Sequence, residues 1–149
     1  MTDPLLSIAE AQAELIETFE ALPDWQERYQ YIIELGQALP PLPAEFQTDT
    51  YKVRGCQSQV WIAPEVRQGR LHFQAGSDAI ITAGLIAVLL SVYNARTPKE
   101  ILTTPPDFIK AIGLSQHLSP SRSNGLLSMV RRIFDAASAA AGEDASVHG

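Results

Sequence analysis

The chain has 149 residues, of which 46% are hydrophobic and 19% are charged, a composition typical of a folded domain and not of a disordered chain. Its net charge of −6 leaves no basic excess to neutralise phosphates, which argues against a nucleic-acid partner. The first residues do not resemble a signal peptide and the most apolar run, residues 80–92, is too short to span a bilayer, so we expect a cytoplasmic protein without a membrane partner.

Two helices are expected at the start of the chain. Ser7 and Glu10 have the spacing of a capping box, and apolar residues at helical intervals follow them. Pro23 interrupts this pattern, and a second helix is expected to begin after Asp24 and to end near Gly36. The prolines that follow cannot continue a helix and predict a stiff connection.

The next part of the chain predicts a small antiparallel sheet. Residues around Val53, residues 59–63 and residues 70–75 have strand character, and the last two segments flank a turn at residues 64–69. Apolar and polar side chains alternate along residues 70–75, which is the period of a half-buried strand. We therefore expect about three strands, with Cys56 in the loop that leads into the middle one.

A central helix and two short helices are expected next. Residues 79–93 are apolar on nearly all sides, as in a core helix, and either Ser77 or Asp78 can cap that helix. One short helix is expected to begin after Thr97, because a proline and an acidic residue follow it at capping-box spacing. A second short helix is expected over residues 107–112.

Ser121 is expected to cap a long final helix that ends near Gly142. Residues 1–142 then form a single domain, and residues 143–149 form a disordered tail. The order of the elements predicts an α+β fold in which helices pack on one face of a small antiparallel sheet.

The single cysteine of the chain stands in the run Arg54-Gly55-Cys56-Gln57-Ser58. A lone thiol can neither close an internal disulfide nor supply the ligands of a zinc or iron–sulfur site. Gly55 removes bulk beside the sulfur, Arg54 favours the reactive thiolate, and the two polar residues that follow can hydrogen-bond a partner. The competing interpretation is a buried, inert cysteine, because free cysteine is among the most buried residue types. The residues alone leave both interpretations open.

Other polar residues are weaker candidates. His117 can act as a base toward Cys56 only if the fold joins them, and no Asp or Asn stands out to orient it. Arg122 belongs to a serine-rich helix start that can hold an anion, although an ordinary helix cap is the simpler explanation. Asp78 is first a helix cap and second a contact to the cysteine loop. The chain has no glycine-rich phosphate cradle, so no cofactor is expected on it.

Several segments resemble the SufE family of sulfur-acceptor proteins. They are YIIELG at residues 31–36, GCQSQVW at residues 55–61, GLIAV at residues 84–88 and QHLSPSRSNGL at residues 116–126. The segments keep the order of the family and cover most of residues 25–137, and the Gly-Cys-Gln-Ser motif with its Val and Trp is specific. The resemblance implies the α+β fold that the family shares with iron–sulfur scaffold proteins.

The resemblance also implies an activity. Cys56 is expected to take persulfide sulfur from a cysteine desulfurase (SufS-like or CsdA-like), to stimulate that enzyme by unloading it, and to deliver the sulfur to an iron–sulfur scaffold complex. Pyridoxal phosphate belongs to the desulfurase, so this chain needs neither a cofactor nor a metal and has no independent catalytic activity. Asp78 and Arg122 occupy family-like positions near the cysteine loop or the interface. SufE-like proteins can form dimers, so a homodimer is compatible with the resemblance.

The expected chemistry makes a prediction about the loop. A persulfide has to be kept from reductants in solution, so Cys56 is expected to be sheltered in the free protein and exposed on docking, with Gly55 as the hinge. The alternatives are an iron–sulfur scaffold, which one cysteine per chain disfavours, a single-cysteine redox sensor, and an interaction module with an inert cysteine.

Overall fold

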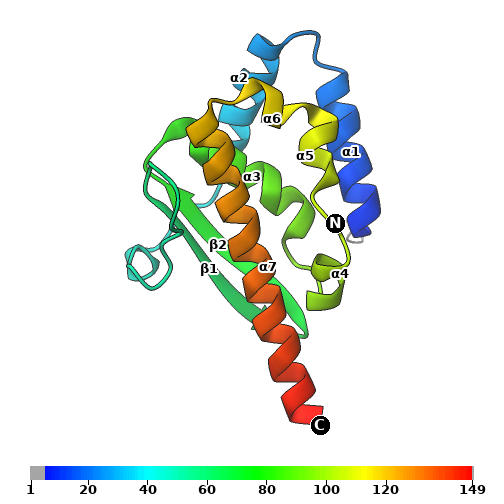
Figure 1. Cartoon of the computed structure of the whole chain (residues 1–149), viewed down its shortest axis with the longest axis vertical. Helices are drawn as coiled ribbons and strands as arrows, with labels where there is room; N and C mark the ends of the chain where they lie inside the picture. Colours follow the sequence, from blue (N-terminus) through cyan, green and yellow to red (C-terminus); the bar gives the residue numbers. More distant parts are fainter. Residues whose placement is uncertain (1–5, 149) are drawn as a thin grey trace.

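Helices pack on one face of a small antiparallel sheet, which confirms the α+β class (Figure 1). The structure is a computed structural model that describes residues 6–148, with side chains described as far as residue 142. Residues 1–5, where a signal peptide is not expected, and Gly149, the last residue of the expected tail, lie outside the described residues.

The first two helices begin where the sequence predicts them. Helix α1 spans Ile8–Glu20, and Ser7 and Glu10 form the predicted capping box. Helix α2 spans Trp25–Gln37, and the side chain of Asp24 accepts a hydrogen bond from the Glu27 backbone N–H at 2.9 Å. Both caps satisfy amides that have no partner inside their helix. The proline-rich connection then leads into a short 3-10 helix, η1, at Ala44–Phe46.

The sheet is a hairpin of strand β1, Val60–Arg67, and strand β2, Arg70–Ser77. Its turn is shorter than the predicted loop at residues 64–69, because only Gln68 and Gly69 separate the strands. Both of these residues have positive φ angles, 53° and 76°, as a tight two-residue turn with the native strand twist requires.

The expected third strand is reduced to one bridged residue. Lys52 pairs with Trp61, and the Val53 N–H donates to the Val60 carbonyl at 2.8 Å. The chain turns at Gly55, where φ is +91°, so pairing cannot continue beyond this point. The prediction of about three strands is therefore wrong by one, although β1 does lie between the bridged segment and β2.

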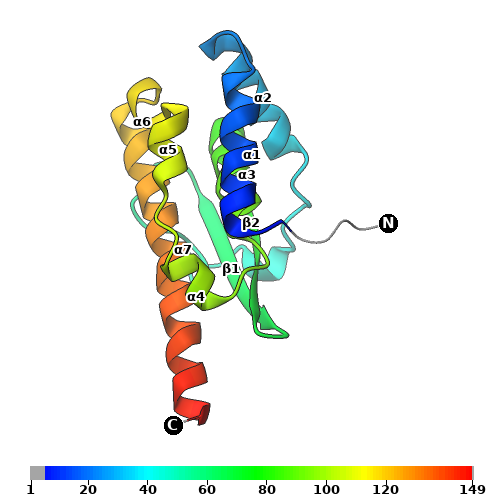
Figure 2. The ribbon, with the colours of Figure 1, turned by 90° about the vertical axis from the view of Figure 1, so that its right-hand side faces the viewer.

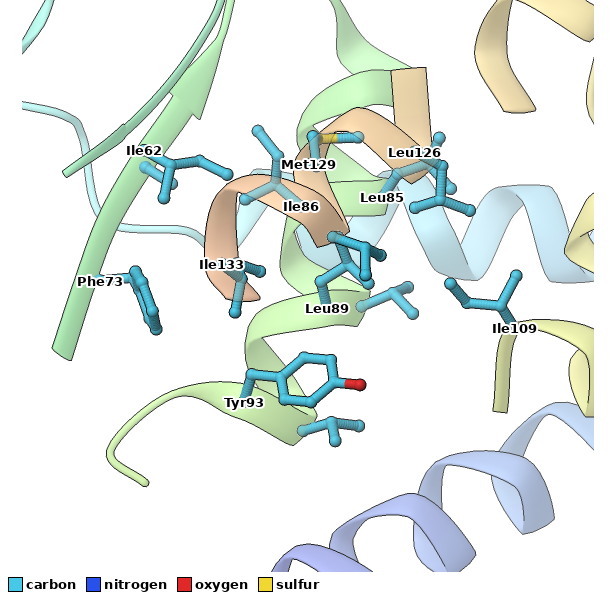
Figure 3. Close-up of a cluster of buried hydrophobic side chains, with 14 of the residues drawn as sticks. Ile62, Phe73, Leu85, Ile86, Leu89, Tyr93, Ile109, Leu126, Met129 and Ile133 are labelled. Atoms are coloured by element: carbon cyan, nitrogen blue, oxygen red, sulfur yellow. The ribbon is translucent and has the colours of Figure 1, made fainter. Parts of the chain in front are cut away.

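Helix α3, Ile80–Tyr93, is the central element of the core, as predicted. The inward side chains of the hairpin, such as Ile62 and Phe73, point toward α3 and the final helix (Figure 3). The predicted cap is wrong, because the N-cap residue is Ala79 and no side chain caps the first turn. Ser77 accepts a hydrogen bond only from the Ala79 N–H, at 3.1 Å.

Helices α2 and α3 approach each other through two glycines. A Cβ atom on Gly84 would lie 2.2 Å from the carbonyl oxygen of Ile32, and one on Gly36 would lie 2.5 Å from the backbone nitrogen of Gly84. Gly36 therefore does not end its helix by adopting a left-handed conformation. Its missing side chain lets the two backbones pack against each other.

The short helices and the final helix complete the chain. Helix α4 spans Pro98–Leu102, α5 spans Asp107–Ile112, α6 spans Leu114–His117 and α7 spans Pro120–His148. Thr97 forms the predicted capping box of α4, and Gly113 ends α5 with a φ of 90°. The helix α6 is not predicted from the sequence.

Helix α7 differs from its prediction at both ends. Ser119, and not Ser121, caps the helix, because its hydroxyl accepts a hydrogen bond from the Arg122 N–H at 3.3 Å and proline occupies the first helical position. The helical backbone continues past Gly142 to His148, where the sequence predicts a disordered tail. One glycine costs only about 1 kcal/mol inside a helix, so it need not end one. In Figure 2, α7 runs along one side of the molecule and extends beyond the other helices.

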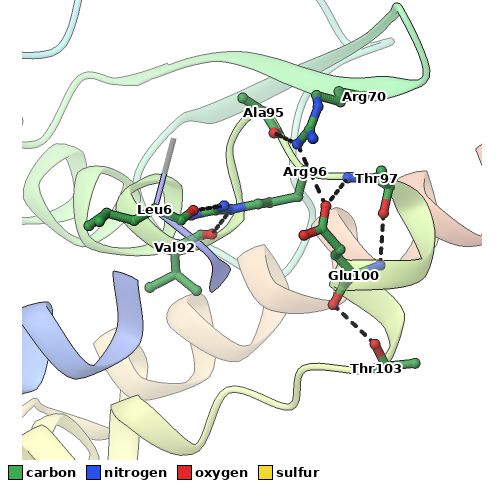
Figure 4. Close-up of polar contacts among 8 residues, drawn as sticks. All are labelled: Leu6, Arg70, Val92, Ala95, Arg96, Thr97, Glu100 and Thr103. Atoms are coloured by element: carbon green, nitrogen blue, oxygen red, sulfur yellow. Dashed lines mark hydrogen bonds and ion pairs between the residues drawn. The ribbon is translucent and has the colours of Figure 1, made fainter. Parts of the chain in front are cut away.

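A polar cluster fastens the hairpin to the end of α3 (Figure 4). Arg96 is buried, its Nε donates to the Val92 carbonyl at 3.0 Å, and burial lowers its pKa. The backbone N–H of Thr97 donates to the carboxylate of Glu100 at 2.9 Å, and this bond is the main reason that the Glu100 pKa is low. Glu100 also faces Arg70 of β2 at 3.7 Å.

Candidate functional site

Cys56 lies in the loop between the bridged segment and β1, against the first turns of α7. Its Sγ donates a weak hydrogen bond to the carbonyl oxygen of Gly125 at 3.6 Å. A Cβ atom on Gly125 would lie 3.5 Å from that sulfur, and one on Gly55 would lie 2.5 Å from the hydroxyl of Ser128. The two glycines thus leave the room that the loop needs to rest on α7, and Cys56 is half-buried there.

The cysteine opens into a cleft of about 620 Å³, which we call the sulfur cleft. Its walls are the loop at residues 56–58, the start of α3 and the first turns of α7. Leu85 and Met129, both buried, also line it, whereas the exposed residues Ile80 and Arg122 lie at its rim. Two helix N-termini therefore face one cavity beside the only thiol, and helix N-termini favour negative charge.

Burial raises the pKa of the Cys56 thiol above its ordinary value. The shift has this direction because removal from water disfavours the thiolate. Arg54 does not line the sulfur cleft but a separate one beside it. Burial is the only cause of the shift, so in this conformation Arg54 does not lower the pKa of the half-buried Cys56.

Asp78 ties the cysteine loop to the start of α3. Its Oδ1 accepts a hydrogen bond from the Gln59 backbone N–H at 3.0 Å, and its Oδ2 accepts one from Gln59 Nε2 at 3.5 Å. Of the two interpretations that the sequence allows for Asp78, the helix cap is wrong and the contact to the cysteine loop is observed. Gln59 stands three residues after Cys56, so this bond limits how far the loop can move.

The structure brings most of the other candidate residues to the sulfur cleft. Gln57 and Ser58 line it from the loop, and Arg122 lines it from the first turn of α7. Gly55 lies immediately before the cysteine with a φ of +91°, a conformation that glycine adopts readily and other residues do not. Gly125 had no role in the reasoning from residue types, although it stands in the motif at residues 116–126, because its effect comes only from the folded distance to Cys56.

His117 lies apart from this site. It does not line the sulfur cleft, its ring stacks on Trp25 with centroids 3.9 Å apart, and its Nδ1 lies 3.0 Å from the Gly113 carbonyl oxygen. A Cys–His pair is therefore not assembled. Within residues 6–142, whose side chains the structure describes, no group of three or more His, Cys, Asp or Glu side chains could hold a metal ion. No helix in the same part of the chain is long and apolar enough to cross a membrane.

Comparison with known proteins relates this site to a family. The family model of the SufE Fe-S metabolism associated domain matches residues 13–137. An uncharacterized SufE-like protein of Rhizobium meliloti (strain 1021) is 41% identical over 125 residues, which cover 80% of this chain and 89% of the relative. An uncharacterized SufE-like protein of Rhizobium etli is 42% identical over 129 residues, which cover 83% of this chain and 87% of the relative.

A solved structure supports the fold. The solution structure of a hypothetical protein from Thermus thermophilus matches with a TM-score of 0.75 at 22% identity, over 89% of this chain and 96% of that one. At this identity the likeness shows the architecture alone. The family match over most of the chain and the two close relatives show more: the chain belongs to the SufE family, whose domain is associated with iron–sulfur metabolism.

Proposed function

We propose that this protein accepts sulfur from a cysteine desulfurase on Cys56 and carries it, as a persulfide, to iron–sulfur cluster assembly. The observation that carries the proposal is the position of the only thiol of the chain, in a cleft that two helix N-termini face, in a member of a family associated with iron–sulfur metabolism. The proposal includes stimulation of the desulfurase, because removal of its sulfur frees its own cysteine for the next turnover.

The transfer step is a thiol–persulfide exchange. The Cys56 thiolate attacks the outer sulfur of the donor persulfide, a new S–S bond forms, and the old S–S bond breaks. The donor cysteine leaves as a thiolate and receives the proton that Cys56 gave up. One sulfur atom moves and the overall oxidation level is unchanged, so no further oxidant or reductant is needed.

Transfer requires the loop to leave α7. In the resting position, burial raises the pKa of Cys56 and so reduces the share of the nucleophilic thiolate. Two hydrogen bonds hold it: the sulfur with the Gly125 carbonyl, and Asp78 with the backbone of Gln59. Each is individually weak, so a docking partner can release the loop with Gly55 as its hinge. Release also returns the thiol to a setting in which the thiolate forms more readily.

The return of the loaded loop would protect the carried sulfur. The sulfur cleft has room for one more sulfur atom beside Cys56, and the absent side chain of Gly125 leaves space next to Sγ. The N-terminus of α3 has no side-chain cap, so its first amides can face a persulfide anion. A lone thiol persists in a reducing compartment, and the proposal places the protein in such a compartment, as in the cytoplasm.

The raised pKa also separates this proposal from a redox sensor. Sensor cysteines have low pKa values and are accessible to oxidants, whereas Cys56 is half-buried and has a raised pKa. An iron–sulfur scaffold needs more thiolates than this chain has. Sulfur transfer needs one thiol on the acceptor, and this chain has one.

The test uses a cysteine desulfurase, cysteine labelled in its sulfur, and this protein either as wild type or as Cys56→Ser. We expect reductant-labile label on wild type alone, with a mass increase of one sulfur atom on the peptide that contains residue 56. Desulfurase turnover should rise with wild type and not with the variant. Equal labelling of both proteins would remove Cys56 from the reaction, and an unchanged turnover would remove the stimulating role.

A further inference from the structure

A second cleft lies on the other side of the cysteine loop and gathers basic side chains. It has a volume of about 480 Å³ and is formed by residues 49–54 and the face of α7 from Ser128 to Asp135. Four of the 11 lysines and arginines of the chain line it, namely Lys52, Arg54, Arg131 and Arg132. The whole protein has a net charge of −6, whereas this basic cleft has more positive than negative side chains.

The basic side chains of this cleft form no ion pair with a carboxylate among the residues whose side chains the structure describes. Across residues 6–142, whose side chains the structure describes, the ion pairs are Arg67 with Glu65 and Arg70 with Glu100, and neither involves the basic cleft. Asp49 and Asp135 line the cleft without forming an ion pair in that part of the chain. Four positive and two negative side chains leave a local charge of about +2, by simple subtraction.

Arg132 is held at the wall of the basic cleft by a hydrogen bond to β1. Its Nη2 donates to the Ile62 carbonyl at 3.3 Å, which fixes the guanidinium beside β1. Its Nε is buried and has no acceptor in the described part of the chain.

We propose that the basic cleft docks an acidic peptide segment of a partner protein. Carboxylates fit the forked guanidinium groups of Arg131 and Arg132, and a peptide backbone can also use the oxygens of Asp49 and Asp135. A peptide backbone has N–H groups that can donate to those two carboxylates, whereas the sugar-phosphate backbone of a nucleic acid has none. Lys52, Arg54 and Arg131 are exposed, which suits a segment lying along the surface better than an enclosed small anion.

The position of the basic cleft gives the docked segment access to the cysteine loop. Arg54 lines the cleft and directly precedes Gly55, and Ser128 lines it while touching the place where a Gly55 side chain would be. An acidic segment held by Arg54 and Arg131 would therefore bridge the loop and α7. This docking requires no sulfur chemistry, so it stands independently of the function proposed for Cys56.

The test is a titration of the isotope-labelled full-length protein with an end-blocked octapeptide of glutamate, followed by amide NMR shifts. A glutamine octapeptide and inorganic phosphate serve as parallel probes. We expect saturable shifts confined to residues 49–55 and 128–135 with the glutamate peptide, weaker with increasing salt, and none with the glutamine peptide. Lys52→Glu and Arg131→Glu should each weaken binding by about tenfold or more, the value of one strong charge-assisted contact.

The matched control is Lys99→Glu, which makes the same change of charge at an exposed lysine outside the basic cleft. It should leave the affinity nearly unchanged. Thermal melts of all three variants check that they remain folded. Equal weakening by Lys99→Glu and Arg131→Glu would overturn the proposal, because binding would then follow net charge alone. Tighter binding of phosphate than of the peptide would also overturn it.

Discussion

Two pairs of glycines bring backbones together in this protein, and the two contacts have opposite characters. Gly36 and Gly84 join α2 to α3 inside the core, where an added Cβ would meet backbone atoms at 2.2–2.5 Å. Gly55 and Gly125 let the cysteine loop rest on α7, where an added Cβ would meet a serine hydroxyl or the sulfur itself. The first contact packs backbone against backbone beside the buried Ile32, whereas the second is accompanied by a few polar bonds. On the function proposed for Cys56, the first contact is permanent and the second is released when a partner docks.

The largest expected effect is a loss of stability on changing the permanent contact. In Gly84→Ala the new methyl group would collide with the carbonyl oxygen of Ile32. The backbone atoms of closely packed helices cannot move away without a large cost in free energy. We expect the free energy of unfolding to fall by about 3 kcal/mol, which outweighs the better helix propensity of alanine. Urea denaturation measures this change. A loss below about 1 kcal/mol would show that α2 and α3 are free to separate.

A smaller loss is expected at the releasable contact. In Gly55→Ala a left-handed backbone and a clash with the Ser128 hydroxyl act together, and we expect a loss of about 1–2 kcal/mol in unfolding free energy. Gly69→Ala is the matched control, because Gly69 also has a positive φ but has no atom near its Cβ position. The difference between the losses of unfolding free energy in the two variants gives the part that is due to the contact with α7. Equal losses would mean that only backbone strain matters.

Removal of the Asp78 bond should open the loop without unfolding the protein. Asp78→Ala deletes the acceptor of the Gln59 N–H, worth about 1 kcal/mol, and should speed alkylation of Cys56 by iodoacetamide roughly fivefold. Asp78→Asn keeps an acceptor oxygen at the same place and should stay close to wild type. If both variants react at the wild-type rate, the bond does not restrain the loop.

The pH dependence of that alkylation gives the smallest effect. Because burial raises the pKa of Cys56, the rate of wild type should reach half its maximum at a higher pH than the rate of a free cysteine peptide. Asp78→Ala should move this midpoint down toward the ordinary value. A folded pKa above the unfolded one also means that Cys56 contributes stability below the ordinary thiol pKa, and that this contribution is lost as the pH rises through the folded value. A midpoint equal to that of the peptide would contradict the sheltered state.

Local patterns in the sequence predict the local structure well. The capping boxes at Ser7 and Thr97 depend only on residues three positions apart, and both form as expected. The strand expected around Val53 fails because pairing depends on a partner elsewhere in the chain and stops at the next turn. The cap assigned to Asp78 fails for the same kind of reason, since the competing donor, the Gln59 N–H, is 19 residues away.

The position of the candidate site was predictable from the sequence, but its electrostatics were not. The lone Cys56 between Gly55 and two polar residues marks that position from the sequence alone, and its reactivity stays a prediction. Whether Arg54 or burial governs the thiol depends on which way the loop turns, and that direction is set by packing on α7. The basic cleft could not be predicted from the sequence. Arg54 and Arg131 are 77 positions apart along the chain and come together only in the fold.

Arg54 lines the basic cleft and Cys56, two residues later, lines the sulfur cleft. Binding in the basic cleft and movement of the cysteine loop can therefore affect each other. If an occupant of the basic cleft makes it easier to lift the cysteine from α7, then lifting the cysteine must strengthen the grip on that occupant by the same factor. A partner that leaves one cleft and a sulfur atom that enters the other would then be thermodynamically coupled events, with no contact between them.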